Sequence, residues 1–285
     1  MEKVRLKIVD SKNIYGTMNG GTIRLTNITE SDKKMLADEN GLTSEELQNY
    51  AFTPADKKKI FTIHRKMFAE EEQFDWHKMF MADQVDKNGS YFEITEEYTK
   101  QNPNGWTDIN EDILVITDKN PGVVVGHPVA DCPVVIMEDK TKGVTAVGHC
   151  SAELIDKKMP MKIADVLVNG YGSKEEDISA YVSACAGNSW TYDTWPKWAT
   201  DSTVWEDGIV VDDNGLFHID LRTVISKQLE ERNISHVFFD PTDTITDPNY
   251  YSNSAASASG LNDASKFGRQ FIGAVYQKER KAKSR

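Results

Sequence analysis

The chain has 285 residues, with 33 basic and 45 acidic side chains and a formal net charge of −12. This charge disfavours a nucleic-acid ligand because phosphates would be repelled. No apolar stretch approaches the roughly 20 residues that cross a membrane. Three cysteines, an odd number, fit a reducing compartment better than a disulfide framework. We therefore expect a soluble cytoplasmic protein and, because no linker is evident, a single domain over residues 1–285.

The first predicted elements are helices within a polar segment at about residues 29–80. Apolar residues recur there at helical spacing between charged ones. Thr43, followed by Glu46, is typical of a capping box, and Thr53-Pro54 marks a second helix start. We expect these helices to cover a sheet.

The centre of the chain predicts a β-hairpin. Residues 122–130, 133–137 and 144–149 are short runs rich in β-branched residues, and a polar turn over 138–143 ends in glycine. Cys132 opens one arm and His149, seventeen positions later, closes the other, so antiparallel pairing brings them together. A thiol beside an imidazole can act as a nucleophile or bind a metal. Taken singly, a cysteine among valines is usually inert and a strand-end histidine usually only finds a hydrogen bond.

Other chemistry-bearing residues follow the hairpin or precede it closely. Cys150 is expected to pack in the core and Cys185 to be a weak candidate for a pocket wall. His127, before Pro128, is either a site residue or part of a strand bulge. The aromatic segment 190–198 suits a wall for a ring-shaped ligand, a subunit interface or plain core packing. The Ser- and Ala-rich residues 252–263 are predicted to form a flexible loop.

An ordered set of motifs resembles the YfiH-like family, also called the laccase-domain or multicopper polyphenol oxidase family. The set covers almost the whole chain and consists of Gly20-Gly21, Gln84-Val85, Asp112 to Thr117, Pro121-Gly122-Val123, Ala130-Asp131-Cys132-Pro133 with His149, His218 to Leu221, Tyr250 to Ser252 and Gly268-Arg269. The resemblance implies an α+β fold in which mixed β-sheet layers are flanked by helices, a YfiH-like, cysteine-hydrolase-like architecture.

The same resemblance implies a site built on Cys132 and His149. Where the family carries a first histidine this chain has Asp86, so Asp86, Cys132 and His149 would be the three ligands of a zinc ion with an open fourth position. Alternatively, Asp86 is a turn residue before Gly89. Where the family carries a cysteine this chain has Asp243, which could assist proton transfer in catalysis beside Cys132 and His149.

Several family arginines are absent, and Glu153 stands at one of their positions. Because guanidinium groups hold phosphate bidentately, their loss argues against phosphate-dependent chemistry. Arg24, Arg222 or Arg269 could compensate.

The resemblance implies an enzyme acting on a small molecule, with zinc-assisted chemistry on a nucleoside or amide of the purine nucleoside phosphorylase, adenosine deaminase or hydrolase type. A metal-free Cys-His hydrolase and a diverged, inactive binding protein are the alternatives. Copper is less expected than zinc, because a copper oxidase would want several clustered histidines and the chain has six, mostly scattered.

Overall fold

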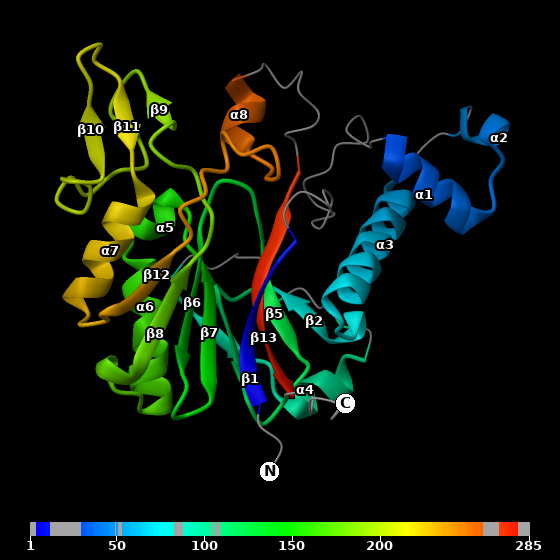
Figure 1. The fold of residues 1–285 in the computed structure, drawn as a ribbon, viewed down its shortest axis with the longest axis horizontal. Helices are drawn as coiled ribbons and strands as arrows, with labels where there is room; N and C mark the ends of the chain where they lie inside the picture. The colour runs from blue at the N-terminus through cyan, green and yellow to red at the C-terminus, as the bar shows by residue number, and fades with distance from the viewer. Residues whose placement is uncertain are drawn as a thin grey trace, which may run out of the picture.

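The computed structural model describes residues 4–11, 30–48, 50, 53–82, 88–103, 105, 109–258 and 268–278. Within these residues, two mixed β-sheets stand side by side with helices on their outer sides (Figure 1). No helix in these ranges is long and apolar enough to cross a membrane. The predicted α+β class with mixed sheets flanked by helices is confirmed, whereas the single domain over 1–285 stays a prediction.

The larger sheet has six strands in the order β12-β8-β6-β7-β4-β3. Its strands are β3 (Tyr91–Glu93), β4 (Ile113–Thr117), β6 (Val134–Asp139), β7 (Val144–His149), β8 (Ile178–Val182) and β12 (His236–Phe239). The central strands pair antiparallel, whereas the outermost pairs, β12 with β8 and β3 with β4, are parallel. The hairpin expected between residues 133 and 149 is β6–β7, with Val134 opposite His149.

The smaller sheet has four strands in the order β1-β13-β5-β2. They are β1 (Val4–Asp10), β2 (Met79–Met81), β5 (Val124–Val129) and β13 (Gln270–Lys278). Pairing of β1 with β13 puts Val4 opposite Lys278, so residues near both ends of the chain meet at one sheet edge. Where β13 pairs with β5, Gly126 lies opposite Gly273. A Cβ on Gly273 would lie 2.1 Å from the carbonyl oxygen of Val125. Glycine is required there because the two backbones approach too closely for any side chain.

One hydrophobic core lies between the two sheets. Leu114, Val134 and Val147 of the larger sheet pack there with Val125 and Ile272 of the smaller one. A second core lies on the other face of the larger sheet, under α5 (Ala152–Asp156), α6 (Met159–Asp165), the π-turn η3 (Val166–Gly170) and α7 (Leu221–Glu231). The alternation of side chains along each strand explains why the larger sheet has apolar residues on both faces.

The helical segment begins at Glu30, and only part of it packs on a sheet. It comprises α1 (Glu30–Asn40), α2 (Ser44–Gln48) and α3 (Pro54–Glu72). The expected capping box of Thr43 with Glu46 is present, and the expected helix start at Thr53 carries a second capping box, formed with Asp56. Phe68, near the end of α3, packs on the outer face of the smaller sheet, whereas Leu36 and Ile60 pack α1 against α3 in a separate small cluster. The expected cover is therefore confined to the last turns of α3.

The remaining elements surround these layers. They are the 3₁₀ turns η2 (Trp76–Lys78) and η4 (Glu175–Asp177), α4 (Glu96–Gln101), α8 (Asn253–Ala258) and a small sheet of β9 (Thr191–Tyr192), β10 (Ile209–Val211) and β11 (Phe217–Ile219). In the figure, α8 and the small sheet lie at the same end of the molecule, above the ends of β7 and β5 (Figure 1).

Candidate functional site

Cys132 and His149 come together at the open end of the β6–β7 hairpin, as predicted. The antiparallel pairing runs one residue beyond the strands, where the amide of Cys150 donates to the carbonyl of Pro133 at 2.8 Å. Cys132 therefore lies directly past the last paired residue, and His149 is the last residue of β7. Both line one cavity of about 220 Å³.

Asp131, which lines the cavity, accepts hydrogen bonds from two residues that are distant in the sequence. One carboxylate oxygen accepts a hydrogen bond from the Thr244 hydroxyl at 2.9 Å, and the other accepts from the amide of Ser254 at 2.7 Å. The second bond holds the start of α8 at the rim, where Asn253 and Ser254 line the cavity. Sequence reasoning quoted Asp131 within its motif but assigned it no role, because both partners lie more than 100 residues away.

Arg269 places a positive charge beside the thiol. It lines the cavity from the residue before β13 and donates to the carbonyl of Gly268 at 2.7 Å. Burial and the Asp131 carboxylate raise the pKa of Cys132 to about 12, although the Arg269 guanidinium acts in the opposite direction. The thiol of the metal-free chain is therefore protonated at neutral pH. Of the two compensating arginines that the structure describes, Arg222 and Arg269, it is Arg269 that lines this cavity.

Trp190 supplies a flat wall to the cavity. It stacks on Trp198, with ring centroids 5.5 Å apart and an interplanar angle of 18°. Trp205, by contrast, is fully buried in the core under the larger sheet. The aromatic segment 190–198 thus combines two of its three expected roles, because Trp190 lines the cavity while Tyr192 and Trp198 pack against the core. A subunit interface stays a prediction.

His127 lies behind His149 rather than on the cavity. The two ring centroids are 6.2 Å apart, and Nε2 of His127 lies 3.2 Å from the carbonyl oxygen of Val147. Burial lowers the pKa of His127 to about 4, so the ring is neutral at physiological pH and Nε2 donates to that carbonyl. Its role here is to support the strand that ends in His149.

Asp243 does not line this cavity. Its carboxylate accepts hydrogen bonds from the Ser189 hydroxyl at 2.5 Å and from the amide of Ile245 at 2.9 Å. Its neighbour across an isolated bridge is Cys185, which is fully buried and also absent from the lining. Both residues hold loops together, and Asp243 lies outside the cavity lining that contains Cys132 and His149.

Arg222 is also used structurally. Its guanidinium donates to the backbone carbonyls of Asp240 and Cys185, at 3.0 and 3.4 Å, and to that of Thr242. A guanidinium whose donors are occupied by three carbonyls is poorly placed to hold a ligand anion.

The segment 252–263 differs from the expected loop over part of its length. Residues Asn253–Ala258 form α8, because Ser252 caps its first turn through the amide of Ala255 at 3.0 Å and Asp131 binds the amide of Ser254. Residues 259–263 lie outside the described ranges. Short polar residues at a helix start are caps as often as they are loop residues.

The side chains of the cavity include ligand types that zinc prefers, but fewer ligands than a catalytic zinc site needs. Cys132 and His149 offer the sulfur and nitrogen donors that zinc prefers, whereas a catalytic zinc needs three protein ligands. Among the residues that the structure describes, no three His, Cys, Asp or Glu side chains gather closely enough to hold a metal ion. Asp86, the expected third ligand, lies outside the described residues, as does Arg24.

Comparisons with known proteins cover most of the chain. The model of the family described as multi-copper polyphenol oxidoreductase laccase matches residues 39–275. The solved structure of YlmD from Geobacillus stearothermophilus aligns with a TM-score of 0.64 at 15% identity, covering 77% of this chain and 81% of that one.

A Bacillus licheniformis hypothetical protein, YfiH, aligns with a TM-score of 0.61 at 17% identity, covering 76% of this chain and 81% of that one. A Neisseria meningitidis protein aligns with a TM-score of 0.58 at 12% identity, covering 77% and 82%. A search of curated proteins finds no match. These structural likenesses show a shared fold.

Proposed function

Because this chain belongs to the multi-copper polyphenol oxidoreductase laccase family, we propose that it is an enzyme acting on a small molecule at Cys132 and His149. The observation that carries the proposal is their convergence on one cavity, which also receives Arg269 and Trp190. Its volume of about 220 Å³ is below the roughly 300–1,000 Å³ of most ligand pockets. We infer that it receives the reacting ring or amide of a nucleoside or amide substrate and not the whole molecule.

The substrate's orientation follows from two residues of the lining. A planar ring or amide can stack on Trp190, whose own position is fixed by Trp198. Arg269 points a permanent positive charge into the same space and can hold the group on which negative charge develops. This arrangement supports Arg269 as a replacement for the missing family arginines.

Zinc is the cofactor that we propose, with Asp86, Cys132 and His149 as its ligands and copper less favoured. When bound, the ion would make a water molecule acidic enough to attack near neutral pH. A raised thiol pKa in the metal-free chain does not oppose this, because coordination removes the proton from a thiol outright. His149 would be oriented by the strand end that His127 supports.

Metal-free hydrolysis is the second candidate, and the placement of Arg269 beside Cys132 favours it. His149 would take the Cys132 proton and the thiolate would attack an amide carbonyl, forming the S–C bond while Arg269 faces the oxyanion. The C–N bond then breaks, and the leaving amine takes its proton from His149. Water hydrolyses the thioester, releasing a carboxylic acid and restoring the thiol.

Three free cysteines are compatible with a reducing compartment such as the cytoplasm.

Metal analysis separates the two candidates. The protein is purified without a metal-binding tag as wild type, Cys132→Ala and Asp86→Asn. About one zinc per chain in the wild type, lost in both variants, is the expected result. No metal in the wild type overturns the zinc proposal and leaves the thiol mechanism.

A ligand screen tests the enzyme proposal itself. Nucleosides, phenols and amino-sugar nucleotides are screened by thermal shift and for turnover, with Cys132→Ala as the matched variant. Turnover that the wild type shows and Cys132→Ala lacks is expected. A ligand that binds both proteins equally and is turned over by neither would instead indicate a binding protein.

A further inference from the structure

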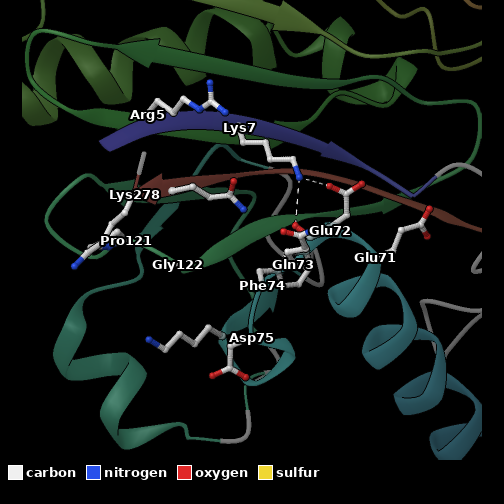
Figure 2. A pocket seen from close by; sticks show the side chains of 12 residues that line it. Arg5, Lys7, Glu71, Glu72, Gln73, Phe74, Asp75, Pro121, Gly122 and Lys278 are labelled. Atoms are coloured by element: carbon white, nitrogen blue, oxygen red, sulfur yellow. Dashed lines mark hydrogen bonds and ion pairs between the residues drawn. The ribbon is translucent and has the colours of Figure 1, made fainter. Parts of the chain in front are cut away.

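A second, larger cleft of about 840 Å³ lies at the other end of the smaller sheet. It is bounded by the start of β1, the end of β13, the segment after α3 and the turn at Pro121-Gly122 (Figure 2). Arg269 precedes β13 and Lys278 ends it, so nine residues of extended chain separate the two sites. At about 3.3 Å per residue, the separation is roughly 30 Å. The cleft is therefore independent of the Cys132 cavity.

Four basic and three acidic side chains line this cleft. Two of the acidic groups already have partners within the protein. Glu72 pairs with Lys7 at 2.5 Å, an interaction that crosses one end of the cleft (Figure 2). The Asp75 carboxylate accepts from the amide of His77 at 3.0 Å and lies 2.8 Å from Nδ1 of the same ring. Glu72 is thereby used within the protein, whereas Asp75 keeps its negative charge and lies close enough to Lys78 to interact with it electrostatically.

Arg5 and Lys78 form no ion pair with any carboxylate of the described ranges. Lys78 is half-buried and also lines a neighbouring cleft of about 410 Å³, which Asp75 and Pro121 share. That neighbouring cleft contains Lys119, which likewise has no carboxylate partner among the described residues. In a chain of net charge −12, a gathering of basic side chains that form no direct ion pair among the described residues marks a place for an anion.

We propose that this cleft binds the phosphate or diphosphate group of a small molecule. Lysine and arginine are the side chains that hold phosphate oxygens, and Gln277 adds an amide donor to the lining. The cleft volume falls within the range of small-molecule sites. Glu71 and Asp75 at its edge, together with the negative charge of the whole chain, favour a compact anion over a nucleic acid.

The test is calorimetric titration of the full chain with inorganic pyrophosphate, at an ionic strength matched with potassium chloride. Saturable binding to the wild type is expected, weakened about tenfold by Lys78→Gln and by Arg5→Gln because each removes one charge-assisted contact. Lys174→Gln is the matched control, since this exposed lysine lies 3.8 Å from Glu176 in η4, away from the cleft. It and Cys132→Ala should bind as the wild type does, which separates this proposal from the proposed enzyme activity.

Two results would overturn the proposal. One is the absence of saturable binding once ionic strength is matched. The other is binding that survives Lys78→Gln and Arg5→Gln but disappears from a chain ending at Lys278, because the basic residues after Lys278 would then be responsible.

Discussion

The small cavity at Cys132 and the charged cleft at Lys78 lie at opposite ends of the same two strands, β5 and β13. The cavity encloses a thiol, an imidazole and a guanidinium between the larger sheet and the start of α8. The cleft exposes lysines and carboxylates at a sheet edge where residues near both chain ends meet. The thiol, imidazole and guanidinium residues of the cavity are half-buried, whereas Arg5, Glu71, Asp75 and Lys278 of the cleft are exposed to water.

This difference indicates which forces act at the cavity and which act at the cleft. Near the cavity, burial is the largest influence on the pKa of both Cys132 and His127, and it favours the neutral form of each. In the cleft, water screens each charge, so a single ion pair contributes little to stability. We therefore expect changes at the cavity to be large and dependent on pH, and changes at the cleft to be small and dependent on salt.

The largest effect is expected for alkylation of Cys132 in metal-free protein. A thiol with a pKa of about 12, against an ordinary value of 9.0, has about a thousandfold less thiolate near neutral pH. Iodoacetamide should therefore modify Cys132 about a thousandfold more slowly in the native chain than in the chain unfolded in urea. Peptide mapping identifies the modified residue. Equal rates in the two states would show that the cavity does not enclose the thiol.

Asp131→Ala should reduce the free energy of unfolding by about 2–6 kcal/mol. The substitution leaves the buried Thr244 hydroxyl and the amide of Ser254 without their acceptor, and each such loss costs about 1–3 kcal/mol. Urea denaturation measures the change. Asp131→Asn, which keeps one acceptor oxygen, should fall between the wild type and the alanine variant. A change below about 0.5 kcal/mol, typical of surface substitutions, would contradict the enclosed network.

His127 should make stability fall in acid. Its pKa is about 4 in the folded chain and 6.5 ordinarily, so the folded state favours the neutral ring. The stabilisation is complete above pH 6.5 and is lost as pH falls through about 4. The total is about 3 kcal/mol. Urea denaturation at pH 7 and pH 5 should show a smaller loss in His127→Gln than in the wild type, and an equal loss would assign the acid sensitivity to other groups.

The sequence predicted local features well and distant ones poorly. The β6–β7 hairpin and the caps at Thr43 and Thr53 depend on residues close together in the chain, and all are present. The pairing of β1 with β13 joins residues some 270 positions apart and has no local signal. The Ser- and Ala-rich residues 253–258 form a helix, because Asp131, more than 100 positions earlier, binds the amide of Ser254.

The site shows the same division between near and distant residues. Cys132 and His149 were predicted from one hairpin, and the structure brings them together. Asp243 was placed by analogy along the chain. It accepts a hydrogen bond from Ser189, and its part in catalysis stays a prediction. Arg269 reaches the cavity because β13 returns beside β5, a contact that only the folded sheet creates.

The smallest effect is expected for Lys7→Met at the edge of the cleft. The Lys7–Glu72 pair is 2.5 Å long, but about a third of the lysine side chain remains exposed, at 37%. Such pairs contribute about 0.2–1 kcal/mol, and salt reduces that contribution. Urea denaturation at low and high salt should show a small loss that shrinks as salt rises, with Glu72→Gln giving the same loss and the double variant little more. A loss of several kcal/mol that salt leaves unchanged would mean that this end of the sheet is as shielded from water as the Cys132 cavity, and the contrast between the two ends would fail.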